Sequence, residues 1–413
     1  MNRRLAVRDP LLLVLSLVLS IMGLVMVFDI TYVESLREQG TWLAREAVIQ
    51  CIAVAVGVVL ALAVSWMPVT RMRRLATPLW WLATIALALT LVPGVGTVRN
   101  GSRRWLEFGP LSVQPSEFAK VAIILFVAAV MADRARWPRR RKRFRTFSLW
   151  MDCVAVPKLK RCLPAAWVLI PAFLIAQEPD LGTAFAIVAT AFVMFFVGGA
   201  TIKTLAVGAL LATVVVGGYI VKEPFRMQRF EVYFQPWNPE LLDGPGYQTS
   251  QSQFAMATGG AFGQGIGVGR AKHVLPAAGT DFVMATVAEE LGFVGVLVFL
   301  AVLAGIVLRL FYLSAIAPTA FGSLFLCGVG SWLAIQGALN VMQANGAFPA
   351  IGIPFPLVSA GGSSMVAIWI ALGLCQAALS PVAETVTAGE TARHRRRDRG
   401  ARVPRARSRP AGA

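Results

Sequence analysis

Apolar stretches long enough to cross a lipid bilayer recur along almost the whole chain. A membrane-spanning helix needs about 20 such residues. The sequence offers ten candidates, at about 11–31, 44–66, 76–93, 117–133, 164–177, 181–200, 203–221, 286–313, 320–343 and 364–381. The chain is 57% hydrophobic and 15% charged, whereas soluble domains carry about 25% charged residues. The sequence therefore predicts an all-α polytopic integral membrane protein with ten transmembrane helices.

The distribution of Lys and Arg orients these helices. Cytoplasmic segments are enriched in basic residues, and an even number of spans places both termini on one side. With both termini cytoplasmic, the inner segments carry 28 of the 39 basic residues. This asymmetry predicts cytoplasmic termini and explains most of the net charge of +18, which no nucleic-acid-binding motif accompanies.

The chain divides into one membrane domain, at 1–385, and a basic tail, at 386–413. The tail is rich in Arg, Ala, Pro and Gly and cannot bury a core, so we expect it to be disordered and cytoplasmic. A second basic cytoplasmic segment is expected at 134–163. Three outer segments are too rich in Gly, Pro and Trp to be plain linkers, and they share one side of the membrane: 94–116, 344–363 and the large loop 222–285 between helices seven and eight.

The Gly-rich part of the large outer loop contains a single carboxylate, Asp281, which follows Arg270, Lys272 and His273. A carboxylate beside the membrane with cations nearby is a functional-site hypothesis, and Asp281 would serve as a general base. The alternative is structural, because an acidic side chain just before the eighth span favours the helix dipole. The residues by themselves leave these two interpretations about equal.

Two other outer segments offer groups that could bind an anion. Arg103 and Arg104 are suited to phosphate oxygens, and Trp105 offers a face for a sugar or lipid. Trp and Arg are also ordinary anchors at a membrane boundary, which alone is the slightly better interpretation. In 344–363, Ser363 stands where a Gly-rich stretch enters a helix, a place that could hold an anion or form a rigid loop.

The remaining charged residues near the membrane have structural explanations. Glu117 and Lys120 are spaced to lie on one helix face and to form an ion pair. Asp180 is placed to cap the sixth span, and Glu289 must hydrogen-bond within the protein because it lies inside the eighth. The sequence contains no phosphate-binding P-loop, no His-Glu-x-x-His and only two histidines, which argues against an ATPase, a zinc protease and a His-based triad.

In this order, the outer motifs resemble those of the SEDS family, the FtsW, RodA and SpoVE proteins of bacterial cell-wall synthesis. The resemblance covers roughly 10–381. The motifs that carry it are Asn100-Gly-Ser-Arg-Arg-Trp105, Gln114-Pro-Ser-Glu117-Phe-Ala-Lys120, Glu178-Pro-Asp180-Leu-Gly-Thr183, Gly246-Tyr-Gln248, Phe262-Gly-Gln-Gly265-Ile-Gly267, Thr280-Asp281-Phe282, Glu289-Glu-Leu-Gly292 and Gly361-Gly-Ser-Ser364. They lean slightly towards the FtsW/SpoVE branch and leave division versus elongation open.

The resemblance implies a SEDS fold and an inverting peptidoglycan glycosyltransferase. Such an enzyme polymerises lipid II at the outer face of the bacterial inner membrane and releases undecaprenyl diphosphate. The essential aspartate of the family falls on Asp281, and its functionally important loop tryptophan falls on Trp105. Candidates to bind the substrate or its diphosphate are Arg103, Arg104, Arg270, Lys272, Gln248 and Ser363. The chain departs from the family pattern at Gly279, where a His is usual, and at Ala360, where a Tyr is usual.

The resemblance also implies partners. These are lipid II, a class B penicillin-binding protein that contacts the membrane helices, and other divisome or elongasome proteins. No cofactor is firmly implied, although a divalent cation, Mg²⁺ or Mn²⁺, would suit the diphosphate. A lipid II flippase and a non-catalytic scaffold of the cell-wall machinery are the alternatives. A flippase should need charges through the midplane, whereas the charges here cluster outside, and a scaffold should tolerate Asp281→Asn.

Overall fold

A helix occupies each of the ten ranges in which hydropathy predicts a span. The computed structural model describes residues 9–39, 44–99, 102–109, 111–134, 156–200, 202–222 and 224–380. The ten helices are α1 (Pro10–Gln39), α2 (Arg45–Ser65), α3 (Val69–Thr90), α4 (Pro115–Arg134), α6 (Val156–Gln177), α7 (Leu181–Val197), α8 (Ile202–Lys222), α13 (Val283–Ile316), α14 (Ala320–Ala344) and α15 (Gly362–Ala378).

Five of these helices contain stretches that are long and apolar enough to cross a membrane. The stretches are Pro10–Tyr32, Arg45–Ser65, Pro115–Ala132, Val283–Ile316 and Ala320–Ala344. Large apolar side chains are exposed along α1, among them Val14 and Ile21. Such side chains are stable against acyl chains, whereas in water they would form an exposed patch. The chain is therefore a multi-pass membrane protein, and the count of ten spans stays a prediction.

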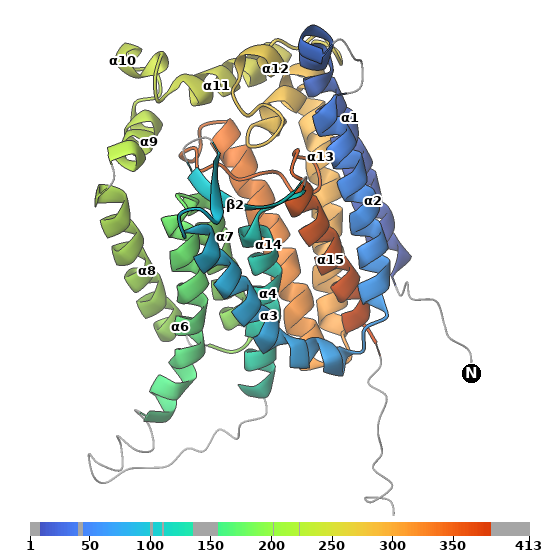
Figure 1. The fold of residues 1–413 in the computed structure, drawn as a ribbon, viewed down its shortest axis with the longest axis vertical. Helices are drawn as coiled ribbons and strands as arrows, with labels where there is room; N and C mark the ends of the chain where they lie inside the picture. The colour runs from blue at the N-terminus through green and yellow to red at the C-terminus, as the bar shows by residue number, and fades with distance from the viewer. Residues whose placement is uncertain are drawn as a thin grey trace, which may run out of the picture. The chain divides into compact units, whose positions relative to one another are not determined.

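The long helices pack in pairs, some of them distant in sequence and others consecutive. α2 packs along α15, and α13 packs along α14 (Figure 1). The largest fully buried side chains include Trp80, Trp332 and Trp369, which come from α3, α14 and α15. Because these tryptophans fill the space between helices, the bundle has an interior of its own in addition to its lipid-facing surface.

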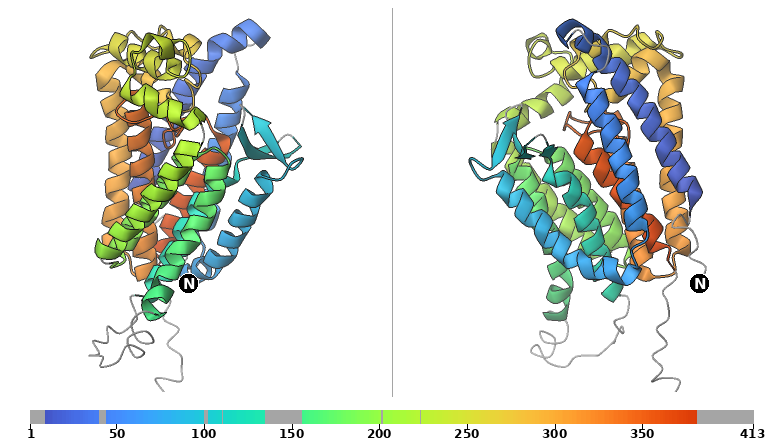
Figure 2. Two further views of the ribbon diagram at one scale, coloured as in Figure 1. Left: turned by 90° about the vertical axis from the view of Figure 1, so that its left-hand side faces the viewer. Right: turned by 45° about the vertical axis from the view of Figure 1, so that its right-hand side comes forward.

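The outer loop 222–285 is largely helical. It contains α9 (Pro224–Phe234), α10 (Pro239–Leu242), α11 (Tyr247–Gly259) and α12 (Ala271–Val274). These short helices gather at one end of the long helices (Figures 1 and 2). α11 packs on α13, so the loop is anchored to a membrane helix.

The expectation of an all-α chain is wrong for the outer segment between α3 and α4. This segment forms a three-stranded antiparallel sheet of β1 (Gly96–Arg99), β2 (Ser102–Phe108) and β3 (Leu111–Val113). Arg99 pairs with Ser102, and the two residues between them in the sequence are Asn-Gly, the pair that most favours a tight hairpin. Pairing the strands satisfies backbone groups that lie outside any helix.

Helix α13 is broken at Gly292, which has φ of 70° and ψ of −171°. The segment 260–265 supplies the hydrogen bonds that the helix loses. The Phe293 amide donates to the Gly260 carbonyl at 2.9 Å, and the Gln264 amide donates to the Glu289 carbonyl at 2.9 Å. A Cβ at Gly292 would lie 2.5 Å from the Ala261 carbonyl oxygen, so only glycine fits this break.

Two predicted segments fall wholly or mostly outside the described residues. The structure does not describe the predicted basic tail at 386–413, and it describes only the two ends of the predicted cytoplasmic loop at 134–163. The end of that loop is described, and it is helical because α6 begins at Val156. Lys and Arg form helices well although they are not apolar, so hydropathy placed the start of this helix too late.

Candidate active site

Asp281 lies at the start of α13, immediately before Phe282, the N-cap of that helix. The helix start carries no side-chain capping hydrogen bond, so capping does not occupy the Asp281 carboxylate. The backbone carbonyl of Asp281 accepts two hydrogen bonds from α14, from Asn340 Nδ2 at 2.8 Å and Gln343 Nε2 at 2.7 Å. These two amides fix the backbone of Asp281 while its half-buried side chain stays available.

The same two amides hold the outer segment 351–353 beside Asp281. Asn340 Nδ2 and Gln343 Nε2 donate to the Ile353 carbonyl at 2.7 and 2.9 Å. Gln343 Oε1 accepts from the amides of Ile351 and Gly352 at 3.2 and 3.1 Å. We name Asn340 and Gln343 the amide clamp. Sequence reasoning missed it, although two buried amides one turn apart on an apolar helix are a signal, because such groups need partners.

A second set of hydrogen bonds joins the residues before Asp281 to the end of the 344–363 segment. Ser359 Oγ donates to the Thr280 carbonyl at 2.5 Å, and the Ala360 amide donates to the Gly279 carbonyl at 2.8 Å. Gln50 of α2 bonds to both sides of this turn, to the Ser359 carbonyl at 3.0 Å and the Gly361 amide at 3.1 Å. The structure thus brings 344–363 against Asp281, as we predicted.

The first outer segment reaches the same place through Arg104 of β2. Arg104 Nε donates to the Glu178 carbonyl at 2.7 Å, and Nη2 donates to the Pro179 carbonyl at 2.6 Å. Asp180 caps α7 as predicted, accepting from the Thr183 amide at 3.1 Å. The sheet and the turn before α7 are therefore one unit, and both Arg104 and Asp180 act electrostatically on Asp281.

Burial raises the pKa of the Asp281 carboxyl from 3.8 to about 6, and the negative charge of Asp180 adds to this rise. The positive charges of Arg104 and Arg229 oppose it. Asp281 is therefore mostly ionised at neutral pH yet far more basic than an ordinary aspartate. A carboxylate with a pKa near the working pH is suited to general base catalysis.

Glu178 is a second perturbed acid at this end of the bundle. It is fully buried, and burial raises its pKa to about 8. A hydrogen bond from Thr90 Oγ1 to its carboxyl and the charge of Arg104 lower the pKa, whereas Asp180 raises it. Glu178 is therefore mostly a neutral acid at pH 7, which leaves Asp180 and Asp281 as the carboxylates facing Arg104.

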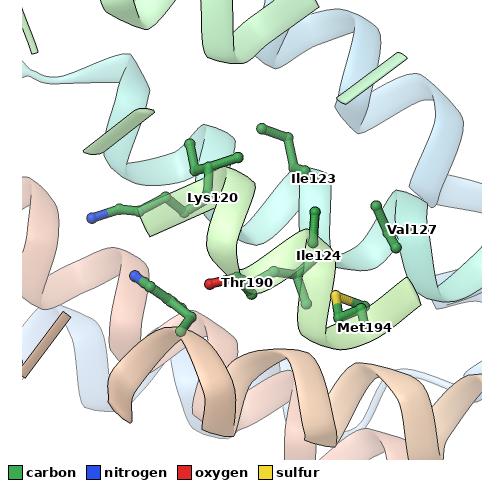
Figure 3. Close-up of a pocket in the computed structure, with 9 residues that line it drawn as sticks. Lys120, Ile123, Ile124, Val127, Thr190 and Met194 are labelled. Carbon is green, nitrogen blue, oxygen red and sulfur yellow. The ribbon is translucent and has the colours of Figure 1, made fainter. Parts of the chain in front are cut away.

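Glu117 and Lys120 form the buried ion pair predicted from their spacing. Lys120 Nζ lies 2.8 Å from Glu117 Oε1 and donates to Gln336 Oε1 at 3.1 Å. The ammonium also sits 5.1 Å from the centre of the Trp332 ring. Beside it lies a cavity of about 10 Å³, room for one water, lined by Lys120, Thr190 and apolar side chains (Figure 3). The pair stabilises the packing of α4 against α14.

Lys272 and Glu289 belong to a separate cluster. Lys272 Nζ lies 2.8 Å from both Asp29 Oδ2 of α1 and Glu290 Oε1 of α13. Burial opposes the charge of Lys272, but these hydrogen bonds outweigh it and raise its pKa. Glu289 accepts from the Arg270 and Ala271 amides at 3.0 and 2.7 Å. The cluster ties the outer loop to two membrane helices.

The other predicted substrate residues occupy the same outer end. Ser363 Oγ accepts from the Gln114 amide at 3.1 Å, a bond that joins 344–363 to the end of the sheet. Arg103 and Trp105 lie half-buried in β2, Gln248 lies half-buried in α11, and Arg270 is exposed. None of these four, nor Lys272, is among the charges or hydrogen-bond partners that the described residues present to Asp281, so their substrate roles stay predictions.

A divalent cation at the diphosphate stays a prediction. Within the described ranges, no group of three or more His, Cys, Asp and Glu side chains is arranged to hold a metal ion. The nearest approach to such a group, Asp29 with Glu290, is already neutralised by an ammonium.

Known proteins match this chain along its membrane domain. Residues 9–381 match the family model FTSW_RODA_SPOVE, described as cell cycle protein. The chain is 33% identical over 370 residues to stage V sporulation protein E of Bacillus subtilis (strain 168), covering 89% of this chain and 95% of that protein. It is 36% identical over 377 residues to the probable peptidoglycan glycosyltransferase FtsW of Aromatoleum aromaticum, covering 89% and 86%.

Solved structures give the same result. The crystal structure of the rod shape determining protein RodA of Thermus thermophilus aligns with a TM-score of 0.62 and 28% identity, covering 91% of this chain and 97% of that chain. A structure described as "Structural coordination of polymerization and crosslinking by a peptidoglycan synthase complex" aligns with a TM-score of 0.69 and 28% identity, covering 89% and 96%. The matched range contains every helix of the bundle, and the chain belongs to the FtsW/RodA/SpoVE family.

Proposed function

We propose that this chain is a peptidoglycan glycosyltransferase that polymerises lipid II. One observation carries the proposal. Asp281, on which the essential aspartate of the family falls, has a pKa raised to about 6 and lies where all three outer segments meet. The names of the relatives, peptidoglycan glycosyltransferase and peptidoglycan synthase complex, support the same activity.

In the proposed reaction Asp281 accepts the proton of the acceptor sugar's 4-hydroxyl. The hydroxyl oxygen forms a bond to the anomeric carbon of the donor sugar. The bond from that carbon to the diphosphate breaks, and undecaprenyl diphosphate leaves with the electron pair. Attack opposite the leaving group inverts the anomeric centre. The proton on Asp281 then passes to water, which restores the base.

The diphosphate carries negative charge that grows as its bond to the sugar breaks. Arg104 is the predicted ligand best placed for it, because it already acts on Asp281 and guanidinium groups match phosphate geometry. Arg103 and Trp105 flank Arg104 in the same strand and are further candidates for the substrate. Gln248, Ser363 and Arg270 remain candidates for the sugar or peptide parts. For Lys272 to bind the diphosphate, the cluster around its ammonium would have to open.

The reaction takes place at the outer face of the bacterial inner membrane in this proposal. The excess of Lys and Arg on the opposite side supports ten spans with both termini cytoplasmic. The structure of a peptidoglycan synthase complex among the similar proteins supports a partner that crosslinks the strands, a class B penicillin-binding protein. Both sporulation and FtsW relatives match, so division and elongation are both compatible with the chain.

The test uses purified full-length protein, with and without its crosslinking partner, and fluorescent lipid II. Wild type should form polymer that lengthens with time, and Asp281→Asn should lose it while keeping the same melting temperature. Asp243→Asn is the matched control, because Asp243 is an exposed outer carboxylate and should be dispensable. Undiminished polymer from Asp281→Asn would refute the base assignment, and lipid II translocation without polymer would favour a flippase.

A further inference from the structure

Arg229 is a cation of the outer loop to which the sequence assigned no role. It lies half-buried on α9, the first short helix of the loop. Its Nη1 donates to the Ala350 carbonyl at 2.7 Å. This bond joins α9 to the 344–363 segment, which also forms the wall beside Asp281.

The bond attaches Arg229 to the same short stretch of chain that faces the carboxylate. Gly352 faces Asp281 so closely that a Cβ there would lie 3.3 Å from Asp281 Oδ2. Ala350 is two residues away, a separation of at most about 7 Å along an extended chain. The amide clamp holds the residues between them, because Gln343 bonds to the amides of Ile351 and Gly352. The guanidinium is therefore bonded to the same short, clamped strip whose Gly352 lies against the carboxylate.

The charges that face Asp281 come from three elements of the described structure. Asp180 at the start of α7 is negative, and Arg104 of β2 and Arg229 of α9 are positive. α14 contributes only the neutral clamp amides, and the 350–353 strip contributes backbone. The two arginines together oppose burial and Asp180, both of which favour the protonated acid.

Arg104 already has another task, because its hydrogen bonds to the Glu178 and Pro179 carbonyls commit it to the turn before α7. Arg229 is held by the wall itself. A positive charge held by the Ala350 carbonyl keeps acting on Asp281 whether or not a substrate is bound, because it does not have to leave that partner.

We propose that Arg229 is a positioning residue for the glycosyl transfer: bound to the Ala350 carbonyl, it holds the strip beside Asp281 and supplies a fixed positive charge that keeps Asp281 in its proton-accepting form. The proposal rests on the proposed function, in which Asp281 is the base. It assigns Arg229 no contact with the reacting atoms.

The test is the pH dependence of lipid II polymerisation by the full-length protein. Loss of the charge in Arg229→Gln should move the acid limb of the rate profile upward by roughly half a pH unit. Arg229→Lys keeps the charge and should leave the limb near its wild-type position, even if the turnover number falls. Lys203→Gln removes the same charge from the exposed start of α8, at the other end of α7, and should leave the profile unchanged.

A smaller side chain has room at this position, because Arg229 borders a cavity of about 10 Å³ between α9, α11 and the 346–350 turn. If Arg229→Gln nevertheless fails to fold, Arg229→Lys provides the test. Because Lys keeps the positive charge, an acid limb that moved by about half a pH unit in Arg229→Lys would overturn the proposal. An unmoved limb in folded Arg229→Gln would overturn it directly.

A second measurement needs no activity and separates this inference from the proposed function. A water-soluble carbodiimide labels protonated carboxyl groups, and mass spectrometry of the peptide with Asp281 gives the labelling midpoint, with Asp281→Asn as the blank. The midpoint should rise in Arg229→Gln and stay in Arg229→Lys. If the midpoint rises in Arg229→Gln but the wild-type protein makes no polymer, the charge effect is supported and the proposed polymerase is refuted. If the wild-type protein makes polymer but the midpoint does not move in Arg229→Gln, the polymerase is supported and the role of Arg229 is refuted.

Discussion

The hydrogen bonds of the amide clamp predict that Gln343 stabilises the 351–353 strip much more than Asn340 does. Gln343 and Asn340 donate to the same two carbonyls, so each carbonyl keeps a donor when one amide is lost. Only Gln343 also accepts, from the amides of Ile351 and Gly352. Leaving a partly buried amide without an acceptor costs about 1–2 kcal/mol. Gln343→Leu should therefore destabilise the 351–353 strip by about 2–4 kcal/mol.

Asn340→Leu is the matched variant and should cost less. Asn340 Oδ1 is buried and has no hydrogen-bond partner among the described residues, so replacing the side chain relieves an unsatisfied acceptor. The two backbone amides of the strip keep Gln343 Oε1 in this variant. We expect the strip to remain ordered and Asp281 to keep its place.

Hydrogen–deuterium exchange of the peptide that spans 346–358 distinguishes the two variants in the folded protein. The Ile351 and Gly352 amides should exchange about 30- to 700-fold faster in Gln343→Leu, because each 1.4 kcal/mol or so of the expected 2–4 kcal/mol corresponds to a factor of about ten. Exchange in Asn340→Leu should stay close to wild type. Equal protection in the two variants, with both melting like wild type, would refute the division of labour within the clamp.

Three further results should follow from the described contacts. Gly292→Ala would force a Cβ onto the Ala261 carbonyl and keep φ at 70°, so its melting temperature should fall, whereas Gly305→Ala on the same helix makes only ordinary contact and should be near neutral. Lys272→Met leaves two buried carboxyl groups without their cation and should cost about 3–5 kcal/mol in a denaturant titration; an unchanged midpoint would mean that water reaches the cluster. The folded state raises the pKa of Glu178 from 4.5 to about 8, so its stabilising contribution is complete below pH 4.5 and is lost as the pH rises through 8; Glu178→Gln should flatten the melting temperature over that range, and an unaltered slope would contradict the burial of this acid.

Hydropathy predicted the long helices well because a bilayer leaves few alternatives to a helix. It predicted their ends poorly wherever polar residues continue a helix. The span expected to end at 31 continues to Gln39, because the polar residues that follow the apolar stretch are still helical. The span expected from 76 begins at Val69, because Arg71 and its basic neighbours are helical without being apolar.

The site itself was predictable in part. Asp281 stood out as a single carboxylate in a Gly-rich loop, and Asp180 and the Glu117 pair followed from helix spacing. The amide clamp and Arg229 did not, because their importance comes from contacts between residues that are far apart in sequence. Arg229 and Ala350 are separated by 121 positions, and nothing local to either residue indicates the other.

The break in α13 at Gly292 affects how a change in bilayer thickness can reach Asp281. After Gly292 the helix is apolar enough to cross a membrane, and before it the first turns of α13 follow directly on Asp281. Segment 260–265 accepts and donates the hydrogen bonds that would have crossed the break. The two halves of α13 are therefore connected by hydrogen bonds to this loop segment instead of by continuous helix hydrogen bonds. A bilayer that is too thick or too thin tilts the half after Gly292. Such a tilt would reach the carboxylate through the hydrogen bonds of segment 260–265, because the helix hydrogen bonds are interrupted at Gly292.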